Sequence, residues 1–403
     1  MIVYRTALAR PPAQDQTLEV PRLVHQVSGI AIFGEQDIRL DFRRFGLQVR
    51  DKTAQLRQAK FFGRMFELFN GCNQVHAFNL RSLSMNNQGG RPPRIRFVAW
   101  NIEKGKRWSL LQACLDCEAI RTADVLCLNE VDDGMARSGN RRIACEIAER
   151  LGMRMVFGPT FRELTKGIGD ELCAPGENTT AVQGNATLSR LSIIDSQNLA
   201  LPMCHDPSQG AEKREGGRHA LIVRLDCGNG RTLTVANAHL EVFTTTRCRS
   251  RQMRFLLQHL DPGPAVVAGD FNTNTFQRGS FVHTFRSLLC LLCLDARARV
   301  TAPWRYEPLF QDLRNTGFLW ERFNDSVPTC SVDLSELQDR AYVPAAIRNR
   351  ILERCRILPL RLDFLACRGL HALSAGRTVT ELPCRPSDHL PITCDIWFDN
   401  MGT

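Results

Sequence analysis

The sequence predicts an α/β protein of the α+β kind, in which two mixed β-sheets pack face to face between outer helices as a four-layer αββα sandwich. Three observations predict this fold. Short apolar segments typical of strands recur from Ile95 to the C-terminal region. The helices between them are few and unevenly placed, so a regular alternation of strands and helices does not fit. Polar clusters directly follow several of the apolar segments, which places the clusters at one rim where loops can converge on a ligand.

The expected strands are runs of aliphatic and β-branched residues bounded by turn residues. We expect them at residues 95–102, 125–129, 153–157, 181–189, 193–199, 220–225, 232–240, 265–268, 361–366, 370–379 and 392–397. Gly228-Asn229-Gly230 joins two of these strands and is a strong hairpin signal. Apolar residues at helical spacing predict helices at 108–120, 143–151, 246–260 and 335–355.

The net charge of +10 is concentrated in the N-terminal part of the chain. Residues 1–96 have 15 Lys and Arg against 7 Asp and Glu, a net charge of +8, which leaves +2 for the remainder. A basic extension is compatible with nucleic acid or an anionic membrane surface, and the alternative is a solvated, arginine-rich extension. The nearly neutral remainder argues against unaided tight binding to long DNA, which usually needs a concentrated basic patch.

The chain shows neither a membrane span nor a standard export signal. Its longest apolar run, Leu288 to Leu294, is far shorter than the ~20 residues of a membrane helix, and no apolar h-region follows the N-terminus. We therefore expect a cytoplasmic protein whose 16 cysteines are mostly free. Two CxxC pairs, Cys114/Cys117 and Cys290/Cys293, lie in helix-like stretches without the Gly-rich knuckle of a zinc ribbon, so a zinc site is disfavoured.

Five polar clusters and one further acid supply carboxylates, amides and two histidines, with no cysteine among them. They are Trp100-Asn101-Ile102-Glu103, Asn129-Glu130-Val131-Asp132, His239-Leu240-Glu241, Gly269-Asp270-Phe271-Asn272, Asp363 and Ser387-Asp388-His389. Such an oxygen-rich ligand set suits Mg²⁺ or Mn²⁺ and a phosphate oxygen. The sequence therefore predicts a metal-dependent phosphoester hydrolase.

Four of these residues stand at the ends of apolar strands. A cation at Glu130 would offset the loss of hydration of a carboxylate at the mouth of a core, and Asn101 can hold a metal-bound water or orient a ligand carboxylate. Asp270 and Asn272 alternate along a segment that we expect to be extended, so that both side chains point the same way. Asp270 can then orient or deprotonate a water, while Asn272 donates to the developing charge.

The remaining candidates include two histidines. Asp388 and His389 are adjacent and, in an extended segment, face opposite ways, so that one can bind metal while the other faces the phosphate. His389 can act as the base or, as imidazolium, stabilise charge on phosphoryl oxygens. Asp363 can orient His389 from a separate strand, and His239 is a second candidate electrophile or acid.

The ordered clusters resemble the endonuclease/exonuclease/phosphatase superfamily, which has the DNase-I-like fold. Its motif series is matched by Trp100-Asn101, Glu130, Gly184-Asn185-Ala186-Thr187-Leu188-Ser189, His239-Leu240, Gly269-Asp270-Phe271-Asn272, Asp363 and Ser387-Asp388-His389. The resemblance covers residues 95–398 and implies Mg²⁺-dependent hydrolysis of phosphoesters. It implies Glu130 as the first metal ligand with Asn101 near it, and Asp388 as a group that binds or approaches the metal.

By the same resemblance, Asp270 and Asn272 position and activate the water, and His389, oriented by Asp363, contacts the phosphate. His239 is implied as an acid or a phosphate contact. Members of the superfamily differ in whether the residue at Asp270 or the residue at His389 is the base, so this assignment stays open.

The sequence departs from the superfamily's better-known branches. It lacks the central-loop tyrosine of abasic endonucleases and the signatures of inositol polyphosphate 5-phosphatases. Residues 135–140 and Phe157-Gly158-Pro159 are most similar to uncharacterised, mostly bacterial, members. The leading interpretation is a phosphodiesterase or nuclease-like hydrolase, expected as a monomer and with nucleic acid among the possible substrates. The alternatives are a phosphomonoesterase or a sphingomyelinase-type phospholipid hydrolase, and a non-catalytic binding protein on the same fold.

Composition and resemblance together predict the domain organisation. Residues 1–94 are expected to be an N-terminal extension and linker, in part disordered, with a polar, Gly- and Pro-containing stretch at 79–94. Residues 95–403 are expected to be the catalytic domain, with an insertion at about 277–360 that caps the site and sets specificity. One hypothesis is that the functional chain begins at Met85.

Overall fold

The computed structural model describes residues 94–273, 299, 301–333, 349 and 356–398. The predicted N-terminal extension, the hypothesis about Met85, the Cys290/Cys293 pair and almost all of the predicted helix at 335–355 lie outside the described residues. Within the described residues, no helix is both long enough and apolar enough to cross a membrane.

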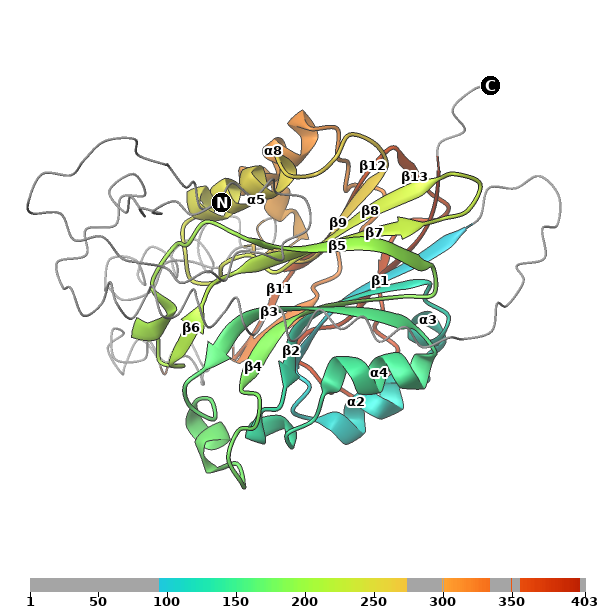
Figure 1. The fold of residues 1–403 in the computed structure, drawn as a ribbon. Coiled ribbons are helices and arrows are strands. Elements are labelled where there is room, and N and C mark those ends of the chain that lie inside the picture. The colour runs from blue at the N-terminus through green and yellow to red at the C-terminus, as the bar shows by residue number, and fades with distance from the viewer. Residues whose placement is uncertain (1–93, 274–298, 300, 334–348, 350–355, 399–403) are drawn as a thin grey trace, which may run out of the picture. The chain divides into compact units, whose positions relative to one another are not determined.

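Two large mixed sheets form the centre of the fold (Figure 1). The strands of the first sheet, in spatial order, are β13 (Leu370–Ala372), β15 (Ile392–Phe398), β1 (Ile95–Lys104), β2 (Val125–Asp133), β4 (Val182–Ser189), β3 (Arg154–Glu163) and β6 (Arg214–Gly216), with β14 (Arg377–Thr378) also on β15. The strands of the second sheet are β12 (Asp363–Arg368), β9 (Ala265–Asp270), β8 (Thr232–Ala238), β7 (His219–Asp226) and β5 (Ser192–Ala200). A separate pair consists of β10 (Cys330–Asp333) and β11 (Ile357–Leu360). Pairs β1/β2 and β8/β9 are parallel, and the other pairs are antiparallel, so both sheets are mixed.

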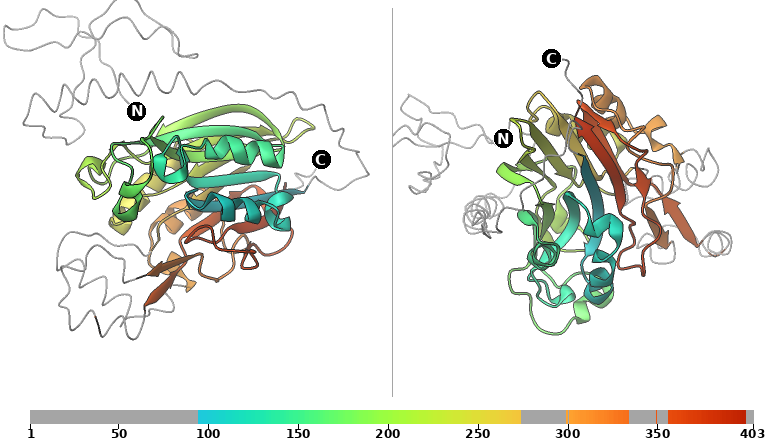
Figure 2. Two further views of the ribbon diagram at one scale, coloured as in Figure 1. Left: turned by 90° about the horizontal axis from the view of Figure 1, so that it is seen from below. Right: turned by 90° about the vertical axis from the view of Figure 1, so that its right-hand side faces the viewer.

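Helices cover the outer faces of both sheets, which Figure 2 shows from two further directions. The helices are α2 (Trp108–Leu115), α3 (Glu118–Arg121) and α4 (Ile143–Leu151) on the first sheet, and α5 (Thr246–Leu257) and α8 (Leu309–Asn315) on the second. Short 3₁₀ helices are η2 (Ala136–Ser138), η3 (Gly169–Cys173), η4 (Pro207–Gln209) and η5 (Pro303–Arg305). The four-layer αββα sandwich predicted from the sequence is therefore confirmed.

Alternation along the strands explains the layers. In β1, Phe97 and Ala99 point into the core between the two sheets, whereas Val98 and Trp100 pack against α2 and α4. Successive side chains of a strand face opposite sides, so one strand serves two cores. The same division holds in the second sheet, where Val266 faces the first sheet and Val267 packs with residues of α5 and α8.

Two predicted elements are wrong in detail. The helix expected at 108–120 is broken into α2 and α3 at Cys117, whose φ of −56° and ψ of 133° are extended rather than helical. The strand expected at 370–379 is two short strands, β13 and β14. Four residues separate Ala372 from Arg377, whereas only two separate their partners on β15, so the extra residues loop out of the sheet.

Part of the segment predicted as an insertion belongs to the core. Phe310 and Leu313 of α8, with Phe318 and Trp320, pack with α5 on the outer face of the second sheet. Leu319 forms a backbone bridge to Cys367 at the edge of that sheet. Residues 309–320 therefore belong to the second sheet's outer layer.

Candidate active site

Strand direction brings the polar clusters to one rim. Parallel strands β1 and β2 end at Lys104 and Asp133, and parallel strands β8 and β9 end just before His239 and at Asp270. The antiparallel neighbours β12 and β15 begin at the same rim, where Asp363 is paired directly with Asp270 and His389 precedes β15. Residues that are hundreds of positions apart in the sequence thus become neighbours.

Asp270 lies at the centre of this rim. Its carboxylate Oδ2 accepts a hydrogen bond from Asn101 Nδ2 at 3.1 Å, and it lies 3.5 Å from His239 Nε2 and 3.9 Å from His389 Nε2. The side chain is buried, and burial, reinforced by the charge of Asp363 and opposed by that of His389, raises the pKa of Asp270 to about 7.

Asp363 and His389 form a buried pair. Asp363 Oδ2 lies 2.8 Å from His389 Nδ1, and Asp363 Oδ1 has no hydrogen-bond partner among the described residues. Burial opposes a charged imidazole, but the charges of Asp363 and Asp388 outweigh it and raise the pKa of His389 well above its ordinary value. A protonated His389 would compensate the buried carboxylate and present its Nε2–H toward Asp270.

His239 is held by an arginine that the sequence did not indicate. Arg218 donates to His239 Nδ1 at 2.9 Å and to Glu241 Oε1 at 3.3 Å. A guanidinium can only donate, so Nδ1 of His239 carries the lone pair and Nε2 carries the proton. Burial and the charges of Arg218 and His389 lower the pKa of His239 well below its ordinary value. His239 is therefore a neutral N–H donor that faces Asp270.

A network of three buried amides joins the two sheets beneath the site. Asn129 Nδ2 donates to Asn185 Oδ1 at 2.9 Å and to Asn237 Oδ1 at 2.8 Å, and Asn129 Oδ1 accepts from the backbone N–H of Asp270 at 2.9 Å. Asn237 Nδ2 donates to the carbonyls of Leu128 and Ala186, which fixes the orientation of its amide. The network anchors the backbone of Asp270 from the opposite sheet.

Gly269 is required for this contact. Its φ is 124°, and a Cβ atom there would lie 2.3 Å from the carbonyl oxygen of Ala238 and 2.7 Å from Asn129 Oδ1. Any side chain would push β9 away from β8 and from the amide network. The Gly-Asp sequence thus combines a close backbone approach with the central carboxylate.

Strained backbone gathers at the rim. Glu103, Lys104, Glu130 and Asn272 all have positive φ values, between 49° and 67°. The register of β1 against β2 shifts between Asn101 and Lys104, and the register of β2 against β4 shifts between Leu128 and Val131, which marks irregularities near the ends of both β1 and β2. Bulges re-aim side chains next to active sites, and non-glycine residues in this region cost about 1–3 kcal/mol each.

Asn272 does not lie in an extended segment as we expected. Its φ is 51°, and its Nδ2 donates to the carbonyl of Leu240 at 3.0 Å, while its backbone N–H donates to Asp270 Oδ1 at 2.8 Å. The alternation with Asp270 predicted from the sequence is therefore wrong, because the chain turns after β9 ends at Asp270.

Two carboxylates at the rim, Glu130 and Asp388, fit a hard divalent cation, whereas Asn101 Oδ1 accepts from the backbone N–H of Glu103 at 3.0 Å. The Glu130 side chain is 26% exposed, and its Oε1 lies 3.3 Å from Asn101 Nδ2. Asp388 keeps contact with solvent, yet loss of hydration together with the charges of Glu103 and Glu130 raises its pKa. Carboxylates that repel one another at a cleft are stabilised by a bound cation.

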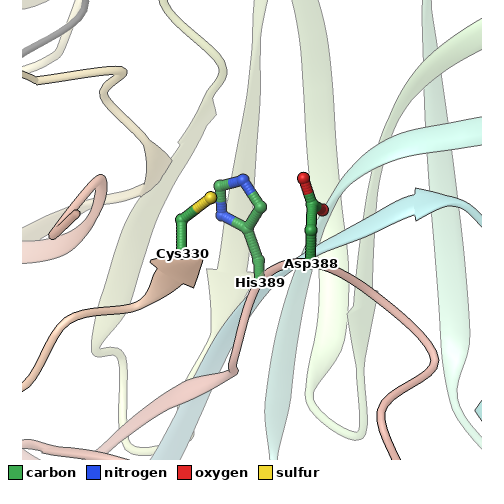
Figure 3. Close-up of side chains that lie close together, drawn as sticks. All are labelled: Cys330, Asp388 and His389. Carbon is green, nitrogen blue, oxygen red and sulfur yellow. The ribbon is translucent and has the colours of Figure 1, made fainter. Parts of the chain in front are cut away.

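Cys330 stands beside these groups. It begins β10, forms a backbone bridge with His389, and its sulfur lies next to the imidazole ring (Figure 3). Burial raises the pKa of the Cys330 thiol to about 11. Within the described residues, two compact groups of ligand atoms occur, Cys330–Asp388–His389 and Asp270–Asp363–His389, and neither includes Glu130.

A buried ion cluster lies next to the rim. Asp132, near the end of β2, accepts two hydrogen bonds from Arg137 at 2.8 and 2.9 Å, and Arg137 also pairs with Glu212. Lys104 Nζ lies 2.9 Å from Glu171 and 3.2 Å from Glu212. Because Glu171 and Glu212 lie outside the strands, the cluster fixes their loops to the ends of β1 and β2.

Two acids of this cluster, Glu163 and Glu212, have pKa values shifted in opposite directions. Burial and the charge of Glu212 raise the pKa of Glu163 to about 7, and Glu163 Oε2 has no hydrogen-bond partner among the described residues. Burial acts the same way on Glu212, but the charges of Lys104, Arg214 and Arg137 outweigh it and lower its pKa to about 2.

A disulfide between Cys204 and Cys248 joins the loop after β5 to α5. Ten other cysteines in the described part of the chain are free, in agreement with the expectation that most are. Cys114 of the first CxxC pair contacts Cys384, 3.5 Å away sulfur to sulfur.

The sequence-predicted residues thus fall into two sets. Asn101, Glu130, His239, Asp270, Asp363 and His389 gather around one point, with Asp388 beside them. Asn272 faces the backbone of Leu240. Sequence reasoning missed Arg218 and Cys330 as neighbours of the histidines, and it missed the structural role of Asn129. Only Asn129 carried a signal, since it precedes Glu130 in a polar cluster.

Comparison with known proteins gives one family. The Endonuclease/Exonuclease/phosphatase family matches residues 98–389. No curated protein sequence matches the chain significantly.

Three of the solved structures that match this chain are as follows. An endonuclease/exonuclease/phosphatase from Beutenbergia cavernae DSM 12333 has 18% sequence identity and a TM-score of 0.47, with 76% of this chain and 72% of that chain covered. The human Nocturnin catalytic domain with bound sulfate has 22% identity and a TM-score of 0.42, with 77% and 96% covered. A 3′-5′ exonuclease (NExo) from Neisseria meningitidis has 16% identity and a TM-score of 0.39, with 74% and 98% covered.

Proposed function

Because this chain belongs to the endonuclease/exonuclease/phosphatase family, we propose that it is a divalent-metal-dependent phosphoester hydrolase of the phosphodiesterase or nuclease-like type. One observation carries the proposal: a buried carboxylate, Asp270, faces two imidazole groups and an amide at distances of 3.1 to 3.9 Å. This arrangement can handle the proton of a water and the negative charge of a phosphoryl group at the same point.

The hydrogen bonds of the two histidines support Asp270 as the base. His239 has its lone pair on Nδ1 toward Arg218, and His389 is paired through Nδ1 with the buried carboxylate of Asp363. His239 therefore presents an N–H group toward Asp270, and His389 does so as an imidazolium, because the charge of Asp363 raises its pKa, so Asp270 is the acceptor among them. We assign Asp270 as the group that orients the attacking water and takes its proton.

The two histidines take the complementary role. The Nε2–H groups of His239 and His389 donate to oxygens of the phosphoryl group as charge builds on them. His389 contributes as a cation because Asp363 compensates its charge, whereas His239 contributes as a neutral donor. Asn272, through its backbone N–H, holds Asp270 Oδ1 and so leaves Oδ2 for the water.

Glu130 and Asp388 would hold Mg²⁺ or Mn²⁺, since both carboxylates keep contact with solvent at the rim. Asn101 would orient Glu130, because its Nδ2 lies 3.3 Å from Glu130 Oε1. When bound, such a cation offsets the negative charge of the phosphate and of the clustered carboxylates. Water would attack phosphorus in line with the leaving group, as expected for this class of reaction.

A substrate panel tests the proposal. The full chain is assayed with bis-p-nitrophenyl phosphate, p-nitrophenyl phosphate, sphingomyelin and plasmid DNA, each with Mg²⁺ or with EDTA. We expect diester hydrolysis with Mg²⁺ and none with EDTA. Preference for the monoester or for sphingomyelin would favour one of the alternative hydrolases, and hydrolysis of none would favour a binding protein.

A further inference from the structure

The thiol of Cys330 is an unusual neighbour for a site of oxygen and nitrogen donors. Cys330 is 3% exposed, and its sulfur lies on one side of the His389 ring while the Asp388 carboxylate lies on the other (Figure 3). One ligand atom from each of these three residues lies within 4.8 Å of the other two. A thiolate, an imidazole and a carboxylate are the three ligand types that bind Zn²⁺ in proteins.

We propose that Cys330, Asp388 and His389 form an inhibitory zinc site. Bond lengths of about 2.3 Å to sulfur and about 2.0–2.2 Å to nitrogen and oxygen place tetrahedral ligand atoms about 3.5 Å apart. The three ligand atoms, which lie within 4.8 Å of one another, would move closer together on binding. Solvent contact at Asp388 leaves the fourth position open to water.

The surroundings of His389 match those of a metal-bound histidine. A histidine that ligates metal through one nitrogen usually donates its other N–H to a carboxylate, which fixes the ring. Asp363 Oδ2, 2.8 Å from His389 Nδ1, occupies that position and leaves Nε2 for the metal. The rest of the zinc ligand set therefore needs only Cys330 and Asp388.

Backbone contacts hold the ligand-bearing segments together. The N–H of Ser331 donates to the carbonyl of Asp388 at 3.2 Å, and the N–H of Leu390 donates to the carbonyl of Thr329 at 2.7 Å. Trp100 Nε1 donates to the carbonyl of His389 at 3.0 Å. Both segments are thus fixed before any metal arrives, which reduces the ordering cost of binding.

The sulfur ligand gives this site a metal preference different from that of the oxygen ligands proposed for Mg²⁺. Thiolate favours Zn²⁺ strongly over Mg²⁺, which prefers oxygen ligands in octahedral geometry. On binding, the thiol of Cys330 and Nε2 of the His389 imidazolium each release a proton to solvent as the sulfur–zinc and nitrogen–zinc bonds form. Zinc would occupy His389 Nε2 and withdraw Asp388, and so block turnover. The inhibition rests on the proposed function, whereas zinc binding itself does not.

Cobalt spectroscopy tests binding without any activity. Co²⁺ is added to the full-length protein and then displaced with Zn²⁺, and sulfur-to-cobalt charge-transfer absorption reports thiolate ligation. Cys330→Ser is compared with the unaltered protein and with Cys227→Ser, which removes a buried thiol at the far end of the second sheet. We expect Cys330→Ser to lose this contribution to the spectrum and to bind zinc at least about tenfold more weakly. A spectrum and affinity equal to those of Cys227→Ser would overturn the proposal.

Turnover is measured in parallel. With Mg²⁺ present, zinc should inhibit the unaltered protein and Cys227→Ser at the same concentration, and Cys330→Ser only at a concentration at least about tenfold higher. Equal inhibition of all three would count against the site. If none turns over substrate, the hydrolase proposal fails while the cobalt spectra still decide the zinc site.

Should Cys330→Ser not fold, Cys330→Ala replaces it. If neither variant folds, zinc protection of Cys330 from alkylation, mapped by peptide mass, decides: protection supports the site and its absence refutes it.

Discussion

Asn129 supports the site from the opposite sheet, and Asn129→Ala removes that support. The substitution deletes two donated hydrogen bonds, to Asn185 and Asn237, and one accepted from the N–H of Asp270. All three partners are buried, and each buried group left unpaired costs about 1–3 kcal/mol. The free energy of unfolding should therefore fall by at least about 3 kcal/mol, a large part of the roughly 5–15 kcal/mol typical of a domain.

The same change should impair the chemistry. Without Asn129 Oδ1, the backbone of Asp270 loses its anchor, and a misplacement of about 1 Å can lower the rate about 10²-fold. Unfolding in urea and kcat with bis-p-nitrophenyl phosphate are measured under conditions in which the variant is folded. The expected pattern is a loss of both stability and kcat.

Asn198 provides a matched control. Its Nδ2 makes one hydrogen bond, to the carbonyl of Pro159 at 2.8 Å, and Asn198 belongs to the outer strand β5. Asn198→Ala should cost no more than about 1.5 kcal/mol and leave kcat unchanged. If Asn129→Ala costs no more than this control, the amide network is not what positions Asp270, and our reasoning about the site's support is wrong.

Two further substitutions test the carboxylates. Asp270→Asn should lower kcat by at least about 10²-fold without lowering stability, since it removes a proton acceptor and a buried charge together; retention of kcat would exclude Asp270 as the base. Glu163→Gln tests the ion cluster. The pKa of Glu163 is about 7 in the folded protein, against an ordinary value of 4.5. Ionisation of Glu163 therefore destabilises the fold progressively from about pH 4.5 to pH 7, and fully above pH 7. The variant should be about 2–3 kcal/mol more stable than the unaltered protein at pH 8 and nearly equal to it at pH 4.5. Stability is measured by unfolding in urea at both pH values. A stability difference that does not change with pH would contradict the raised pKa of Glu163.

The fold could be predicted because its strands and helices follow simple periodicities. Alternating residues of β1 face two different cores, and such strands read as continuous apolar runs. Helix α4 was predicted with correct ends, Ile143 and Leu151, because its apolar face is regular and Gly152 ends it with a φ of 63°. Local patterns decide such elements almost completely.

Features that depend on distant contacts could not be predicted. The bulge that gives Glu130 a φ of 52° and the turn at Asn272 arise where strand pairing stops, and neither has a residue type that marks it. Arg218 lies in a loop of mixed charge, and only the three-dimensional structure shows that it faces His239. Cys330 lies within the segment expected as an insertion, yet a backbone bridge brings it to His389.

The candidate site shows the same division. Residue types and their order were enough to select Asp270, His239 and His389, because strand ends carry the polar groups. The protonation of each histidine depends on partners more than twenty positions away, Arg218 for His239 and Asp363 for His389. A sequence read alone therefore left the choice of base open.

The most direct measurement is Mg²⁺-dependent hydrolysis of bis-p-nitrophenyl phosphate by the unaltered protein, by Glu130→Gln and by Glu149→Gln, an exposed glutamate on α4. We predict turnover that EDTA abolishes and Mg²⁺ restores in the unaltered protein and in Glu149→Gln, with a loss of at least about 10²-fold in Glu130→Gln. Equal turnover by the two variants, or turnover that persists in EDTA, would contradict the account of a divalent cation held at this rim.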